Sequence, residues 1–336
     1  MNNRKLAVGG AAVCVLIFIL CLVLWKSVDR TPQRMSGYEE YVAAAEDPER
    51  VRALCDGRYV TDVEERTIRI PGVQGTYHFL YFSDMHILVM NDEVYEGDRE
   101  EVQGRVQSLA SNGNESKEIF NRLVENANAT DLDGVLLGGD IIDFLSEANA
   151  EWVMQGLERL QAPYLFVTAD HDVSGWWTAY SEEEQAELRK KLDYEPVQVM
   201  DFDEFVILGV SENTSQIRKK ALEQIKEVLA LGKPVIIVQH VPFDSEQGAE
   251  LRELSKANWG ERVLLWGEDE EDAYQPNETT QEYMDLVYAP DSNVAAVLAG
   301  HLHFRYEGMV NGRIRQYIFN PAYSGEVALF TVTGDE

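Results

Sequence analysis

Basic residues and cysteines are both scarce in this sequence of 336 residues. Asp and Glu number 59 against 29 Lys and Arg, so the formal net charge is −30. A nucleic-acid backbone would repel such a chain, so we expect no non-specific nucleic-acid binding. The three cysteines are Cys14, Cys21 and Cys55, and the first two lie in one apolar run. The single remaining cysteine excludes a disulfide framework or a thiolate zinc site in the rest of the chain.

Two widespread catalytic motifs are also missing. Gly232-Lys233 lacks the upstream glycine that a P-loop requires, and no Gly-x-Ser-x-Gly elbow occurs. The sequence contains no internal repeat and no low-complexity stretch. Its 45% of hydrophobic and 26% of charged residues are ordinary values for a globular protein, which argues against disorder or a fibrous repeat.

One long apolar run is present near the start, from Leu6 to Trp25, and it holds twenty residues without a charge. A helix of that length matches the ~30 Å hydrocarbon core of a bilayer. The segment WKSVDR that follows offers no small-x-small cleavage site. We therefore predict a short tail at 1–5 and an uncleaved single-pass anchor in the cell membrane at 6–25. A cleaved signal peptide and a buried core helix are the alternatives.

The orientation of this anchor rests on a weaker argument, because Lys and Arg are similarly frequent on its two flanks. A short tail before a first hydrophobic segment most often stays inside the cell. We therefore expect the body of the protein to be extracytoplasmic, with a cytoplasmic body as the alternative.

The rest of the chain is predicted to be a juxtamembrane helical segment at 26–58 and an α/β domain at 59–336. Residues 35–58 are typical of a helical stalk or packing segment. Thr67–Ile70 and Tyr77–Phe82 flank PGVQG and predict a hairpin, and Asn311-Gly312 predicts another near the C-terminus. The segment EVALFTVTG predicts a last strand. Between the hairpins, five apolar runs alternate with helical periodicity at 117–128, 148–160, 182–191 and 216–231. This alternation indicates at least one sheet covered on both faces.

Five of the six histidines stand just past the end of an apolar run, together with several aspartates. The runs lead in turn to Asp84 and His86, Asp140 and Asp143, Asp170 and His171, His240, and His301 and His303. Ligands of open α/β sheets bind at the carboxyl ends of strands, where residues two apart point to the same side. Carboxylate and imidazole groups suit Mn, Fe or Zn, and about seven such ligands exceed the need of one ion. We therefore predict two divalent ions that share a bridging carboxylate. The alternative is that each histidine merely caps its strand.

The blocks DMH, GDIID, ADHD, QHVPF and GHLH, in this order from about residue 78 to 304, resemble the signature blocks of the calcineurin-like metallophosphoesterases. The resemblance implies a four-layer α/β/β/α sandwich of two mixed sheets with a two-metal centre at the strand ends. It implies that Asp84, His86 and His303 hold the first metal. It also implies that Asp170, His240 and His301 hold the second, and that Asp140 bridges the two. His171 would face the scissile phosphate and be oriented by Asp143.

The resemblance further implies hydrolysis of a small phosphomonoester or phosphodiester by a metal-bound hydroxide, and no protein partner is predicted. One departure is that Ala169-Asp170 stands where the family has Gly-Asn. The alternative function is therefore a metal-binding signalling module of the same fold with little or no turnover. Two insertions, at about 90–117 and 243–280, leave from strand ends beside the predicted metals. We expect them to be lids that select the substrate.

Overall fold

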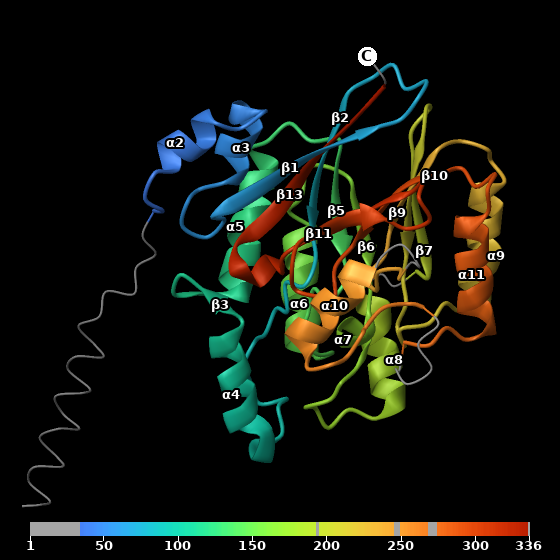
Figure 1. Cartoon of the computed structure of the whole chain (residues 1–336). Helices are drawn as coiled ribbons and strands as arrows, with labels where there is room; N and C mark the ends of the chain where they lie inside the picture. The colour runs from blue at the N-terminus through green and yellow to red at the C-terminus, as the bar shows by residue number, and fades with distance from the viewer. Residues whose placement is uncertain (1–33, 193–194, 245–248, 268–273, 335–336) are drawn as a thin grey trace, which may run out of the picture. The chain divides into compact units, whose positions relative to one another are not determined.

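Two mixed β-sheets lie face to face in the part of the chain that the computed structural model describes, which is residues 34–192, 195–244, 249–267 and 274–334 (Figure 1). The first sheet has the order β1-β13-β2-β5-β6, and its strands are Asp62–Arg69, Glu326–Thr333, Tyr77–Phe82, Gly134–Gly138 and Tyr164–Val167. The second has the order β11-β12-β10-β9-β8-β7, and its strands are Tyr306–Met309, Arg315–Ile318, Val294–Ala299, Val235–Val238, Val206–Val210 and Val197–Asp201. Within them, β2-β5-β6 and β12-β10-β9-β8 are parallel runs.

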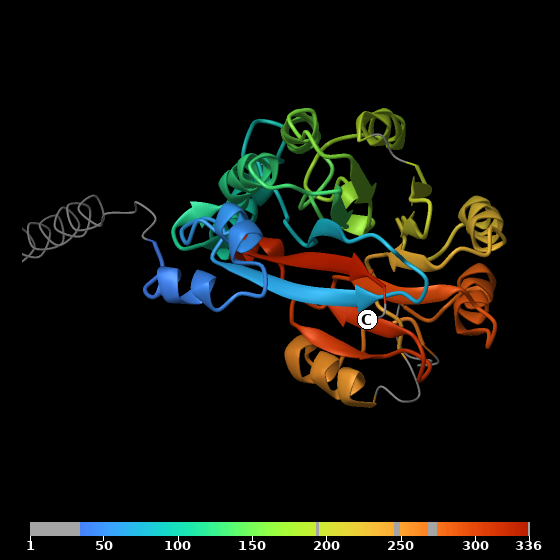
Figure 2. The same ribbon diagram turned by 90° about the horizontal axis from the view of Figure 1, so that it is seen from above.

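Helices cover the outer face of each sheet. On the first sheet lie α2 (Tyr38–Ala43), α3 (Pro48–Leu54), α5 (Ser116–Asn128), α6 (Glu147–Leu157) and α8 (Glu182–Lys191). On the second lie α9 (Lys219–Leu229), α10 (Ala249–Trp259) and α11 (Glu278–Tyr288). The view from above shows helices on both sides of the stacked strands (Figure 2).

Alternation along the strands produces this layering. In β2, Leu80 and Phe82 pack against helices, whereas Phe79 and Tyr81 point to the other sheet. In β8, Val206, Leu208 and Val210 likewise belong to the helix-facing core, whereas Ile207 belongs to the core between the sheets. Because successive side chains of a strand point to opposite faces, a strand covered on both faces must be apolar throughout. The α/β class with mixed sheets is thus confirmed.

Most elements predicted from the sequence are present. The five apolar runs form β2, β5, β6, β9 and β10, and the four helical stretches form α5, α6, α8 and α9. The Asn311-Gly312 turn joins β11 to β12 as an antiparallel hairpin. Residues 35–58 contain α2 and α3, whose apolar side chains Tyr38, Val42, Val51 and Leu54 pack into the core of the first sheet.

The predicted hairpin between residues 67 and 82 is wrong. Strand β13 lies between β1 and β2, parallel to the first and antiparallel to the second. The physical reason is burial: β13 places Val327 and Leu329 against helices and Phe330 between the sheets, so it occupies a central position. The connection from β1 to β2 also buries Ile70 and Val73, and it spans the sheet instead of making a tight turn.

The predicted membrane anchor at residues 6–25 lies outside the described residues. Within the described part of the chain, no helix is both long and apolar enough to cross a membrane.

Candidate metal centre

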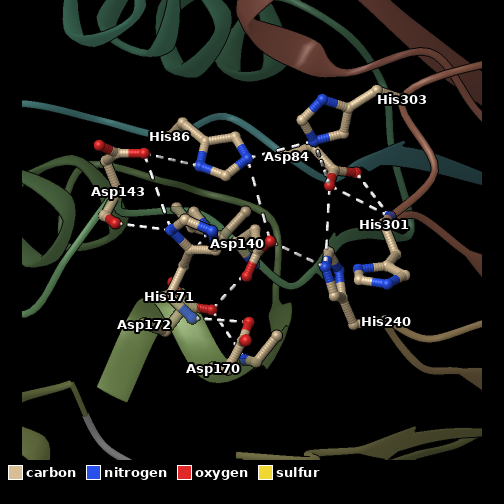
Figure 3. A network of polar contacts seen from close by, with 12 residues as sticks. Asp84, His86, Asp140, Asp143, Asp170, His171, Asp172, His240, His301 and His303 are labelled. Carbon is tan, nitrogen blue, oxygen red and sulfur yellow. Dashed lines mark hydrogen bonds and ion pairs between the residues drawn. The ribbon is translucent and has the colours of Figure 1, made fainter. Parts of the chain in front are cut away.

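The carboxyl ends of β2, β5, β6, β9 and β10 bring the predicted site residues together, although these strands belong to both sheets. Figure 3 shows Asp84, His86, Asp140, His240, His301 and His303 pointing toward one another, with Asp170 and His171 beside them. The aspartates Asp84 and Asp140 and the histidines His86 and His240 are buried. Two sheets therefore supply one convergent set of imidazoles and carboxylates.

The backbone at these strand ends is unusual. Among the described residues, nine that are not glycine have a positive φ, and five of them are Asp84, His86, Asp140, His301 and His303. Such conformations cost free energy for residues with a side chain and tend to gather at functional sites. Here these conformations turn the backbone sharply at the ends of the strands. Side chains two residues apart, such as those of Asp84 and His86, can therefore reach the same site.

Glycines in the motifs permit this close approach. A Cβ at Gly139, which has a φ of 92°, would lie 2.8 Å from Nδ1 of His240. A Cβ at Gly300 would lie 2.4 Å from Oδ2 of Asp84. The glycines of GDIID and GHLH are therefore required because the metal-site side chains pass directly over their backbones.

The first group of candidate ligands is Asp84, His86 and His303, whose nearest ligand atoms all lie within 4.8 Å of one another. Nε2 of His303 is 3.2 Å from Oδ1 of Asp84 and 3.3 Å from Nε2 of His86. Burial raises the pKa of Asp84, but the imidazoles of His240 and His303 outweigh it and hold the pKa at about 2. Asp84 is therefore ionised over the physiological pH range.

The second group is Asp140, His240 and His301. Oδ2 of Asp140 is 2.9 Å from Nε2 of His240 and 3.9 Å from Nε2 of His86, so this carboxylate lies between the two groups. Nδ1 of His240 donates to the carbonyl of Gly138 at 2.9 Å, which leaves Nε2 directed at Asp140. Burial, aided by the charge on His240, lowers the pKa of His301 to about 3 and keeps that imidazole neutral.

Asp170 lies beside this centre, but its nearest candidate ligands are not the expected His240 and His301. Its ligand atom lies within 4.8 Å of those of Asp140 and His171, and it is not grouped with His240 and His301. Asp170 is the first residue of the short helix α7 (Asp170–Val173), and Oδ1 accepts the backbone N–H of His171. Burial and the neighbouring Asp140 carboxylate raise the pKa of Asp170. Two carboxylates so close together favour a cation between them.

Asp143 contacts both His171 and His86, by different atoms. Nδ1 of His171 donates to the backbone carbonyl of Asp143 at 2.6 Å and lies 3.7 Å from its Oδ1. The carboxylate instead accepts a hydrogen bond from Nδ1 of His86 at 3.0 Å and two from Arg105. Asp143 therefore fixes the His171 ring through its main chain and the His86 ring through its side chain.

Three supporting residues were not predicted from the sequence. The buried Asp172 carboxylate accepts the backbone N–H groups of Ala169, Asp140, Ile141 and Ile142 at 2.9 to 3.0 Å and so fixes the loop after β5. Glu212, also buried, accepts the N–H of Val241 beside His240. Arg105 comes from α4 (Arg99–Ser108) in the first insertion. The only sequence signal was that Asp172 is the last residue of the ADHD block, because Glu212 and Arg105 lie outside every motif.

The family model of calcineurin-like phosphoesterases matches residues 77–305. The chain belongs to the calcineurin-like phosphoesterase family. Comparison with curated protein sequences gives no match. The solved structures similar to this phosphoesterase include a dimetal phosphatase from Danio rerio, with 11% identity, 74% of this chain and 88% of the other covered, and a TM-score of 0.45. They also include a purple acid phosphatase from Lupinus luteus, with 14% identity, 77% of this chain and 46% of the other covered, and a TM-score of 0.45. A third is the phosphopantetheinyl hydrolase of Mycobacterium tuberculosis, with 14% identity, 73% of this chain and 90% of the other covered, and a TM-score of 0.42.

The side chains of this phosphoesterase fit the divalent metal ions that the family implies. Oδ1 of Asp140 and Nε2 of His301 are buried and have no hydrogen-bond partner among the described residues. A buried acceptor atom without a hydrogen-bond partner costs free energy of folding unless a hydrogen-bond donor or a cation binds it. Both atoms belong to the second group, and imidazole with carboxylate is the donor set of Mn, Fe and Zn.

A cavity of about 350 Å³ opens above the two groups of ligands. Besides the ligands, its lining contains Arg105, Ser108 and Leu109 from the first insertion, Tyr323, and Trp259, Arg262, Leu264 and Tyr274 from the second. Trp176 exposes 48% of its surface and meets the His171 ring edge-on at 4.6 Å, whereas Trp266 is fully buried in the core. Both insertions thus reach the cavity, and their selection of the substrate stays a prediction.

Proposed function

We propose that this phosphoesterase hydrolyses a small phosphoric ester with the aid of two divalent metal ions. The observation that carries the proposal is the convergence of six imidazole and carboxylate side chains in two adjoining groups, with Asp170 beside Asp140. Two buried ligand atoms in the second group have no hydrogen-bond partner among the described residues. Asp84, His86 and His303 would hold one ion, and His240 and His301 the other. Asp170, whose ligand atom lies within 4.8 Å of that of Asp140, would join the second set. Asp140 would bridge them, because its carboxylate lies between His86 and His240.

Metal ions in such a centre bind the phosphoryl oxygens and make water a nucleophile near neutral pH. The neighbouring residues then hold and orient the reacting groups. Asp143 fixes His86 with Nε2 directed at the centre, and the carbonyl of Gly138 does the same for His240. Asp172 holds the loop that presents Asp140. This preorganisation means that the ligands need no rearrangement when the substrate binds.

His171 is suited to protonating the leaving oxygen. Its Nδ1 is engaged with the carbonyl of Asp143, so Nε2 is the ring atom left for the cavity that His171 lines. Burial lowers the pKa of His171, but the Asp140 carboxylate and the Asp143 carbonyl outweigh it and raise the pKa above its usual value. A protonated imidazole next to the bound phosphoryl group is a general acid near neutral pH.

Hydrolysis of aryl phosphates by the purified full-length protein, measured as release of the aryl alcohol, tests this proposal. We expect hydrolysis of an aryl phosphate monoester or diester with Mn, Fe or Zn, loss of activity on chelation, and recovery on adding the metal back. Asp140→Ala is the matched control, since it removes the proposed bridging ligand from the same fold. The absence of hydrolysis of every ester with all three metals would instead favour a metal-binding signalling module. The specific support for that second function is Asp170, which places a third carboxylate in the centre.

We also propose that residues 6–25 anchor this phosphoesterase in the cell membrane with the catalytic domain outside the cytoplasm. The support is the run of twenty uncharged residues in the sequence. A reporter that works only outside the cytoplasm, fused after Glu336, should be active. Activity of a reporter that works only inside would show the opposite orientation.

A further inference from the structure

The cavity above the metal ligands contains two cationic side chains besides the histidines, one from each insertion. Arg105 comes from α4, and Arg262 follows α10. Cations are scarce in this chain, which has 29 Lys and Arg against 59 Asp and Glu. Two arginines in one cavity of about 350 Å³ therefore call for a physical reason.

Arg105 has such a reason within the protein. Its guanidinium donates from Nε and Nη2 to the buried carboxylate of Asp143, and it lies 5.0 Å from the Trp177 ring. The charge of Arg105 is thus balanced by Asp143, and the contact anchors α4 beside the centre. Nothing about Arg105 requires a ligand.

Arg262 differs, because its exposed guanidinium forms no ion pair with a carboxylate of any described residue. The turn that carries it is nevertheless well fixed. Val263 and Leu264 are buried, and the hydroxyl of Ser255 donates to the carbonyls of Arg262 and Val263. A fixed turn thus holds the Arg262 backbone at the cavity, while no carboxylate among the described residues pairs with its charge.

The same turn has a strained backbone. Glu261 has a φ of 72° and Leu264 a φ of 53°, and a bulky residue such as Leu rarely adopts the left-handed conformation. Leu264 itself lines the cavity. Strain of this kind persists where the surrounding packing imposes it, and it often serves to present a side chain at a functional site. Here the presented side chains are Leu264 and Arg262.

Arg262 lines the cavity together with Tyr274 and with His301 of the second group. The Tyr274 ring packs at 4.9 Å from the His301 ring. Arg105, by contrast, contacts Asp143 beside His86.

We propose that Arg262 binds a second anionic group of the substrate, separate from the phosphoryl group that the metals hold. The preferred substrates are then phosphoric esters that carry a further phosphate or carboxylate on the leaving alcohol. The apolar wall formed by Trp259, Leu264 and Tyr274 contacts the part of the substrate between its two charges. This inference rests on the proposed function, because it assumes that phosphoryl groups bind at the metals.

The test uses two phosphonates that the enzyme cannot hydrolyse, so it does not depend on turnover. 3-Phosphonopropionate carries a carboxylate and propylphosphonate does not, and their phosphonate groups are alike. Calorimetric titration of the Mn-loaded full-length protein should show about tenfold tighter binding of 3-phosphonopropionate, as a charge-assisted hydrogen bond predicts. Arg262→Gln should reduce this preference to less than about twofold, and Arg262→Lys should retain part of it.

Lys256→Gln is the matched control, because it removes the same charge from the neighbouring helix α10, where Lys256 pairs with Glu253 outside the cavity. Its preference should equal that of the wild type. Unfolding midpoints and manganese content, measured for each variant, confirm that the fold and centre are intact.

Three results would overturn the inference: no preference in the wild type, a preference that survives in Arg262→Gln, or an equal loss in Lys256→Gln. The second would mean that the carboxylate binds the metals, and the third that only the general field matters. Failure of the proposed function is seen separately, as an absence of aryl phosphate monoester and diester hydrolysis by the same wild-type preparation.

Discussion

The substitution Asp170→Asn tests how the centre balances its charges, because it restores the residue typical of the family. Ligand atoms of Asp140 and Asp170 lie within 4.8 Å of each other. Two unit charges at that distance repel by about 3 kcal/mol at an effective dielectric constant of about 20. Asp170 is partly exposed, and solvent weakens the repulsion, so we expect chelated Asp170→Asn to be more stable than chelated wild type by about 1 to 3 kcal/mol.

The pH dependence of this gain has a definite sign. Burial and Asp140 raise the pKa of Asp170 above its usual value of 3.8, so the folded protein binds more protons than the unfolded protein between the two values. Stability from this group is therefore lost as pH rises through that window. Denaturant unfolding of chelated protein should show the advantage of Asp170→Asn near neutral pH and no advantage below the usual value.

With metal present, the negative charge of Asp170 should become favourable instead of unfavourable. Two divalent ions bring four positive charges, against three negative charges from Asp84, Asp140 and Asp170, and the asparagine leaves one more positive charge uncompensated. We expect Asp170→Asn to bind the second Mn(II) about tenfold more weakly, by equilibrium dialysis, and to turn over faster once Mn(II) is saturating. If neither the stability of the chelated protein nor the manganese affinity changes, Asp170 is not part of the centre.

Three further predictions concern single residues of the site. Asp140→Ala should lose both metals and all hydrolysis, because it removes the proposed bridging ligand, and elemental analysis showing two retained metals would contradict this. His171→Gln should keep both metals while lowering the turnover number by about a hundredfold or more, and loss of metal would refute its role as an acid. Burial raises the pKa of Glu212 to about 8 from 4.5, so the folded state loses stability as pH rises between these values. Chelated Glu212→Gln should therefore be more stable than chelated wild type at alkaline pH and equal to it near pH 4, and an advantage independent of pH would refute the assignment.

The site could be predicted from the sequence to the extent that strand ends are visible in it. Five apolar runs, each followed by Asp or His, were enough to expect the meeting of Asp84, Asp140 and His240, because parallel strands deliver their carboxyl ends to one edge. The spacing of His301 and His303 likewise indicated side chains on one side. The position of Asp170 within the centre needed the geometry of α7, which the motif does not encode.

Contacts between distant segments could not be predicted in this way. The insertion of β13 between β1 and β2 depends on burial of Leu329 and Phe330 by parts of the chain far away in sequence. Arg105 is 38 residues from Asp143 in the sequence. It belongs to α4, whose sequence REEVQGRVQS is mostly polar and gives no sign that one of its arginines reaches a buried carboxylate. Such pairings arise from tertiary packing and leave no local periodicity.

We propose that two metal ions in one centre make this chain a phosphoric ester hydrolase. Chelator-treated full-length protein can be titrated with Mn(II) while phosphate release from an aryl phosphate monoester is followed. We predict no release without metal and a rate that rises until two equivalents per chain are bound. A rate that is independent of metal, or that is complete at one equivalent, would contradict this assignment.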